Sequence, residues 1–128
     1  MPGAISAPAL MLPMKATASI TRGQLVKVGS NEDEVLPSAG AAEAGVLGFA
    51  YNDAANGEHV TIQCSGVAIA KAGGSITLMQ PLQGAASGAV TASAPSAGTN
   101  ANCVGFALRA ASSGDLFPVL VSRFVLQG

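Results

Sequence analysis

Charged side chains are scarce in this sequence. Among its 128 residues, six are Lys or Arg and seven are Asp or Glu, which is 10% of the chain, where a typical globular domain carries about 25%. Soluble monomers usually keep both signs of charge on their surface. Here Ala, Gly, Ser and Thr must cover the surface instead. Such a surface suits contact with other proteins, and an Ala/Gly-rich soluble domain explains the composition equally well.

The scarcity of basic and aromatic residues argues against a nucleic-acid partner. The net charge is −1, and the chain has one Tyr and no Trp. The basic residues are scattered along the chain rather than clustered: Lys15, Arg22, Lys27, Lys71, Arg109 and Arg123. A nucleic-acid-binding domain needs a basic patch and usually aromatic side chains for stacking. We therefore expect no nucleic-acid partner.

Long apolar runs are also missing. No run approaches the ~20 apolar residues of a membrane-spanning helix, so we expect no membrane partner. No Lys or Arg precedes the first apolar stretch, and Pro2, Pro8 and Pro13 interrupt it, which is unlike a secretory signal. The expectation is a protein made and used inside a cell, with Cys64 and Cys103 reduced.

Residues that carry chemistry are nearly absent. The single histidine, His59, lies at an odd spacing from Cys64, so that the two face opposite sides of one strand. The two cysteines form no Cys-x-x-Cys motif. The acidic run at residues 32–34 lacks the spaced ligands of a calcium loop and is interpreted as a solvated turn. The sequence therefore predicts no enzyme, no catalytic or metal-binding residues and no cofactor.

The first 20 residues form a distinct segment. Its three prolines forbid a continuous helix, and its apolar residues keep no regular period. It is too apolar for an ordinary disordered tail, although a frayed terminus is the alternative. We interpret residues 1–20 as an extended arm that becomes ordered on a partner. Its candidate contact residues are Ile5, Leu10, Met11, Leu12 and Met14.

The remaining residues, 21–128, have the pattern of an all-β domain. Short apolar stretches alternate with Gly-rich turns, and no convincing helical period occurs. Residues 58–64 alternate between apolar and polar positions, as in a strand with one buried face. The predicted strands are residues 24–28, 46–51, 58–64, 67–70, 76–79, 104–108 and 117–121, with a hairpin turn at 71–75.

The most informative feature is an internal repeat. The stretch Val46-Leu47-Gly48-Phe49-Ala50 recurs 57 residues later as Cys103-Val104-Gly105-Phe106-Ala107. In both copies a Gly followed by an acidic residue closes the next turn. Two copies are too few for a solenoid. They predict a small barrel or sandwich built from two related halves, at about residues 23–66 and 80–123.

Three pairs of repeated residues have structural roles. Gly48 and Gly105 are expected to let the backbone pass close to a neighbour. Phe49 and Phe106 are expected to anchor the core from both halves. Gly57 and Gly114 are expected to adopt a positive φ in equivalent turns. None of these roles requires catalysis.

The order of these motifs resembles a family of proteins that decorate the capsids of tailed phages, the decoration or cement proteins. The resemblance covers roughly residues 15–123: an early strand at residues 23–26, then Gly45-Val46-Leu47-Gly48-Phe49-Ala50, the strand at residues 60–67, and the closing segment at residues 104–115. It implies a homotrimer on the capsid exterior of the virion. Such a protein would be made in the host cytoplasm, bind the major capsid protein and stabilise the head against DNA pressure.

Two other classes of protein remain open. One is a small β-barrel that binds a ligand in an internal cavity and exposes no apolar arm. The other is a different structural piece of a virion, such as part of a fibre or baseplate.

Overall fold

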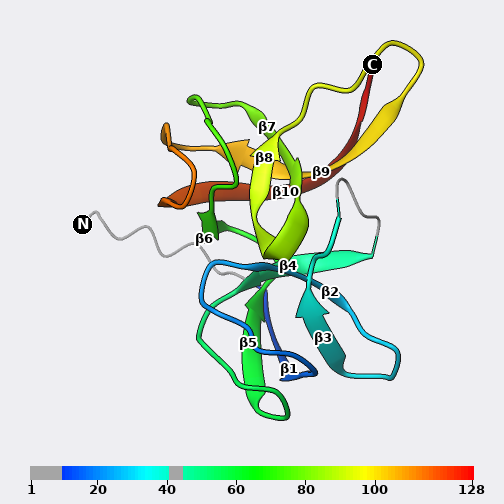
Figure 1. Cartoon of the computed structure of the whole chain (residues 1–128), viewed down its shortest axis with the longest axis vertical. Helices are drawn as coiled ribbons and strands as arrows, with labels where there is room; N and C mark the ends of the chain where they lie inside the picture. The colour runs from blue at the N-terminus through cyan, green and yellow to red at the C-terminus, as the bar shows by residue number, and fades with distance from the viewer. Residues whose placement is uncertain (1–9, 41–44) are drawn as a thin grey trace.

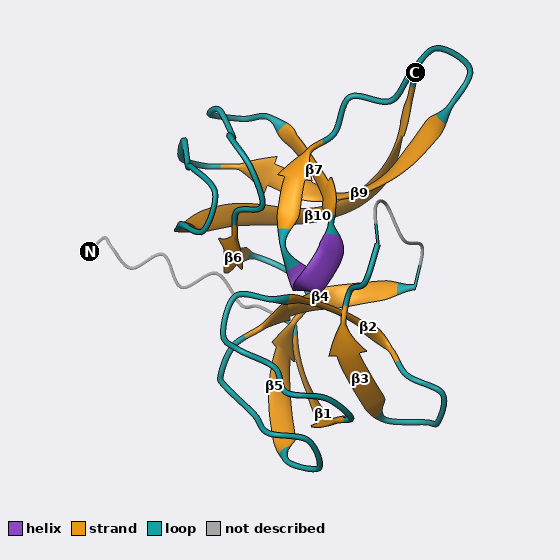
Figure 2. Cartoon of the chain, viewed as in Figure 1, coloured by secondary structure: helices purple, strands orange, loops and turns teal. Residues whose placement is uncertain are grey.

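The computed structural model describes residues 10–40 and 45–128 and is nearly all β (Figures 1 and 2). The strands of its first half are β1 (Met11–Ala16), β2 (Leu25–Val28), β3 (Glu34–Pro37), β4 (Val46–Ala50) and β5 (His59–Gln63). Those of its second half are β6 (Val67–Lys71), β7 (Pro81–Gly84), β8 (Val90–Ala92), β9 (Asn100–Ala107) and β10 (Leu116–Gln127). One short 3-10 helix, η1 (Ala86–Gly88), lies where the two halves meet (Figure 2).

The first half is a closed barrel with strand order β1-β3-β2-β4-β5. The alternation of β5 confirms its predicted faces, because Val60 and Ile62 are buried while His59 is exposed. Small and branched side chains from the strands and turns fill the barrel interior: Ala16, Ile20, Val26, Val35, Ala50, Ala54, Val60 and Ile62. The predicted barrel is therefore confirmed, and its interior is a packed core rather than an open cavity.

The second half repeats the strand pairing of the first. Its sheet has the order β6-β10-β9-β7-β8, and each antiparallel pair has a counterpart in the barrel. A parallel bridge between Ala72 and Val90 joins its two ends. This bridge lies where Ala16 pairs with Val35 in the barrel. The predicted duplication is thus present as a duplicated topology.

The turn glycines confirm the repeat in detail. Gly57 has a φ of 92° and Gly114 a φ of 90°, the left-handed conformation that glycine adopts most readily. The Gly57 N–H donates to the Ala16 carbonyl at 2.7 Å, and the Gly114 N–H donates to the Ala72 carbonyl at 2.8 Å. These hydrogen bonds fasten equivalent turns to equivalent strands.

A second repeated motif was missed in the sequence. Ser19-Ile20-Thr21 recurs as Ser75-Ile76-Thr77. Ile20 forms a bridge with Ala54, and Ile76 forms the equivalent bridge with Ala111. The prediction of a strand at residues 76–79 is therefore wrong: Ile76 forms a bridge, and Met79 adopts a φ of 62° in a turn. The predicted hairpin at residues 71–75 is wrong too, because β6 pairs with β10.

The arm prediction is wrong for β1. This strand pairs antiparallel with β5 and parallel with β3, so residues 11–16 are part of the closed barrel. Pro13 is tolerated because β1 pairs with β3 only at Lys15 and Ala16. The backbone N–H of Lys15 points to that side, so the N–H that Pro13 lacks two residues earlier would have had no partner strand there. The predicted half boundaries, 23–66 and 80–123, accordingly omit the first strand of each half, β1 and β6. Residues 1–9 of the predicted arm lie outside the described residues.

The two halves share one core, and this makes the repeated phenylalanines unequal. Leu25, Val46 and Phe49 of the barrel pack into the hydrophobic cluster of the second half. Phe49 is 1% exposed, as predicted for a core anchor. Phe106 is only half-buried and stacks on Phe124 with ring centroids 4.9 Å apart. The prediction that Phe106 anchors the core is wrong, because this ring lies on the outside of the second sheet.

Candidate functional site

The predicted contact residues at the N-terminal end have different surroundings. Leu10 is 55% exposed and Met11 is 37% exposed. Leu12 is half-buried, and Met14 packs against the barrel core. Ile5 lies outside the described residues. Within the described part of the chain, Leu10 and Met11 are therefore the members of this set that present most surface to a partner.

The potentially reactive side chains are not assembled into a site. His59 is exposed at the start of β5. Cys64 and Cys103 do not form a disulfide in the structure; Cys64 is half-buried and Cys103 is buried. Burial raises the pKa of the Cys64 thiol, and the positive charge of Arg123 lowers it by less. Across residues 10–40 and 45–128, no three His, Cys, Asp or Glu side chains gather where they could hold a metal ion.

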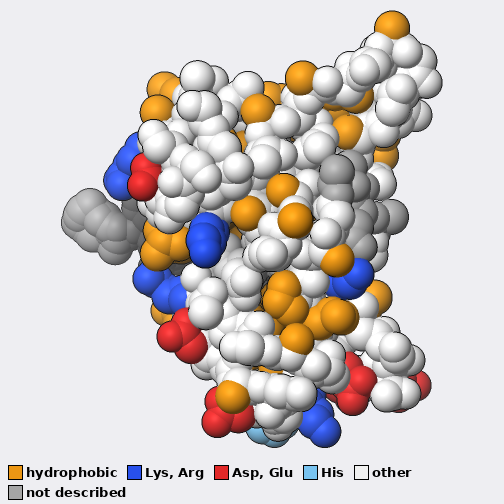
Figure 3. Space-filling view, viewed as in Figure 1, with side chains coloured by type: hydrophobic (Ala, Val, Ile, Leu, Met, Phe, Trp, Pro, Cys, Tyr) orange, Lys and Arg blue, Asp and Glu red, His pale blue; other side chains and the backbone are white. Residues whose placement is uncertain are grey.

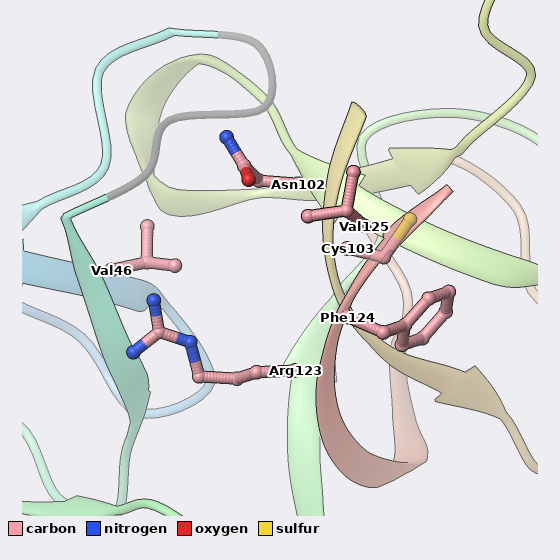
Figure 4. A pocket seen from close by; sticks show the side chains of 6 residues that line it. All are labelled: Val46, Asn102, Cys103, Arg123, Phe124 and Val125. Carbon is pink, nitrogen blue, oxygen red and sulfur yellow. The ribbon is translucent and has the colours of Figure 1, made fainter. Parts of the chain in front are cut away.

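The surface hollows have few groups for chemistry. One of about 200 Å³ lies between β4 and the end of the β9–β10 pair. Figure 4 shows the Arg123 side chain reaching from β10 toward Val46 of β4, with Cys103, Phe124 and Val125 on the other side. A second hollow of about 420 Å³ is lined mainly by small and polar residues around η1. Neither is lined by a carboxylate or an imidazole.

The outside of the second sheet carries an apolar row that sequence reasoning missed. Val67, Leu120, Phe106 and Pro81 are successive cross-strand partners on β6, β10, β9 and β7, so their side chains share one face. Val67 is 50% exposed and Leu120 is 41% exposed. We call these four residues the second-sheet face. The sequence did contain one indication of this face. Gln63 and Leu120 occupy equivalent positions in the two halves, so the second half has an apolar residue where the first half has a polar one.

Charged side chains are unevenly distributed over the side of the molecule that Figure 3 shows. On the side of the molecule in Figure 3, they gather along one flank and at the end formed by the barrel turns. The ribbon formed by the ends of β9 and β10 projects from the body (Figure 1) and shows none on this side. Val125 on that ribbon is 56% exposed. These weakly charged surfaces suit protein contacts more than binding of an ionic ligand.

No helix in the described residues is long and apolar enough to cross a membrane. The fold and these surfaces define a β-rich structural protein made of two similar halves. The model of the phage cement protein family matches residues 6–123. The chain belongs to that family and has a structural role in the phage virion.

A solved structure shares this fold. It is described as the head fiber gp8.5 N base in bacteriophage phi29. The two superpose with a TM-score of 0.70 at 17% sequence identity, over 94% of this chain and 100% of that one. No curated protein matches the sequence.

Proposed function

We propose that this protein is a capsid decoration protein. It binds the major capsid protein on the outer surface of the phage head as a homotrimer, and it stabilises the shell against the pressure of packaged DNA. It is made in the host cytoplasm, acts without a cofactor and catalyses no reaction. The observation that carries the proposal is the match to the cement protein family over residues 6–123, which spans both halves of the fold.

The physical properties of the chain support this role. Only 10% of its residues are charged, and large apolar side chains remain exposed on both halves. Patches of this kind mark interaction surfaces. The shared core makes the two halves one body, which can transmit load between the subunits that it contacts. In a trimer, three weak contacts act together through their effective concentration.

We propose that the N-terminal end contributes to capsid or subunit binding. Leu10 precedes β1 and Met11 begins it, and both are exposed; Ile5 precedes them in the sequence. Leu12 and Met14 are assigned to the barrel instead, because both are at least half-buried. Of the predicted arm at residues 1–20, the proposed contact segment therefore keeps only the residues before β1 and Met11.

The test is decoration of bare capsids by the purified protein. Cryo-electron microscopy of the mixture is expected to show added density on the outside of the shell, and decorated heads are expected to release their DNA at a higher temperature than bare heads. A second expectation concerns a chain without residues 2–9. It should keep the melting temperature of the full chain and decorate less well. Capsids that stay bare in the presence of the full chain would contradict the proposed function.

The solved structure favours one other role, the base of a head fibre, because that protein is the N base of a phage head fiber. Micrographs of intact virions, which hold every virion component, distinguish the two roles. A fibre base would carry density that extends outward beyond the two halves of the fold, whereas a decoration protein would lie against the shell.

A further inference from the structure

The internal repeat allows one surface of the chain to be compared with its own counterpart. In the barrel, Leu25, Phe49 and Gln63 are cross-strand partners on the outside of β2, β4 and β5. In the second half, Pro81, Phe106 and Leu120 are cross-strand partners in the same register on β7, β9 and β10. The two rows are therefore the same surface of the repeated unit.

The row of the barrel is covered by protein. Leu25 is 0% exposed and Phe49 is 1% exposed. Both belong to the hydrophobic cluster of the second half. Gln63 is 8% exposed, and its amide donates hydrogen bonds to the carbonyls of Ser65 and Val67 in the connection between the halves. What covers this row is the following copy of the same fold.

The row of the second half has no such cover within the described chain. Pro81 and Phe106 are half-buried, and Leu120 is 41% exposed. Phe124 stacks on one side of Phe106, but it leaves Leu120 and its neighbour Val67 open. The position that holds a hydrogen-bonded amide in the barrel thus holds an exposed leucine here. A leucine at this position gains its hydrophobic free energy only when it is covered.

We infer that the second-sheet face binds a second copy of this chain. In the barrel, the equivalent surface is buried by the second half, which has the same fold. A second copy of the chain can therefore supply a matching surface for the second-sheet face. The four residues of the face carry no charge, which favours an apolar contact between subunits over recognition of an ionic ligand. This inference rests on the homotrimer proposed above and assigns the surface through which it assembles.

The test is the mass of the full chain and of two variants in solution, without capsids. Multi-angle light scattering of the natural chain should return about three times the mass of 12.5 kDa. Leu120→Gln copies the residue that the barrel has at this position. It should weaken self-association by about tenfold or more. Leu78→Gln is the matched control, since Leu78 is 65% exposed in the turn between β6 and β7 and lies outside the face.

Circular dichroism and the melting temperature decide whether each variant is folded. If Leu120→Gln does not fold, Val67→Thr, at the open edge of the face, replaces it in the same measurement. A folded variant that dissociates while Leu78→Gln stays associated supports the inference. A folded variant with the association constant of the natural chain overturns it, and so does a natural chain that is monomeric at micromolar concentration.

Capsid binding separates this inference from the proposed function. If the natural chain decorates capsids while the Leu120 variant keeps its association constant, the function stands and the assigned surface is wrong. If that variant stays associated but no longer decorates capsids, the face contacts the shell, and the inference is again overturned. Failure of the natural chain to decorate capsids contradicts the function, whatever the mass measurement shows.

Discussion

Replacing Gly48 with alanine should destabilise the protein more than any other Gly→Ala change in the barrel. A Cβ at this position would overlap the carbonyl oxygen of Gln63, and it would lie 2.9 Å from the carbonyl carbon of Gln63 and 3.1 Å from the Cα of Cys64. These are backbone atoms, so rotation of a side chain cannot remove the overlap. Gln63 pairs with Phe49 on one side and with Met11 on the other. Moving it away from β4 would therefore disturb two ladders of the barrel.

Overpacking of a core costs about 1–3 kcal/mol, and occasionally more. Because the overlap here is with the backbone of Gln63 and Cys64, and Gln63 is itself paired on two sides, we expect Gly48→Ala to lower the free energy of unfolding by about 3 kcal/mol or more. For a domain of this size the melting temperature should fall by about 10 °C or more. Urea unfolding followed by circular dichroism measures the free energy, and calorimetry measures the melting temperature.

Two other glycines supply matched controls. Gly74→Ala places its Cβ 4.0 Å from the nearest atom, the Cγ2 of Thr91, and should change stability by less than about 1 kcal/mol. Gly57→Ala meets no atom within 4 Å, but its φ is 92°, so we expect a cost of about 1–2 kcal/mol from the left-handed backbone. A Gly48→Ala variant no less stable than Gly57→Ala would refute the close packing of β4 on β5.

Three further predictions concern single side chains. Phe49→Ala should cost about 3–5 kcal/mol because its ring is fully buried, whereas Phe106→Ala should cost less than half as much; equal losses in urea unfolding would contradict the asymmetry. Gln63→Ala should cost about 1–3 kcal/mol, since it leaves the Ser65 and Val67 carbonyls without the Gln63 amide; an unchanged unfolding midpoint would argue against these bonds. Because burial raises the pKa of Cys64, its thiol should react with Ellman's reagent near pH 8 more slowly than in the unfolded chain, and Arg123→Gln should slow it further; a faster reaction would contradict the direction of the shift.

The parts of the fold that could be predicted from the sequence are those with strong local patterns. The alternation in residues 58–64 predicted β5, and the repeated Gly-Phe-Ala stretch predicted β4 and β9 in equivalent places. The positive φ of Gly57 and Gly114 followed from their place in repeated turns. In each case the physical constraint acts within a few residues, so a short stretch of sequence is enough to reveal it.

The strands that were missed either depend on distant partners or are very short. β1 contains Pro13 and lacks a clean alternation, and it forms a strand because β5 and β3 pair with it on either side. β3, β7 and β8 pair with nearby strands, but they have only three or four residues each. A strand so short shows too few residues for a visible alternation of apolar and polar positions.

Phe49 and Phe106 are equivalent in the sequence repeat but differ in burial. A sequence repeat therefore does not determine which of its copies is covered by the rest of the protein. Each ring occupies the same position in its half, yet one is buried in the joint core and the other lies on an outer surface. The difference arises because the second half packs against the row of the first half, whereas the described residues place no such cover on the row of the second half. Selection for solubility alone would favour polar residues on the exposed second row. This row contains Leu120 and Phe106 instead. Their apolar side chains are the physical reason to expect that another subunit covers the row.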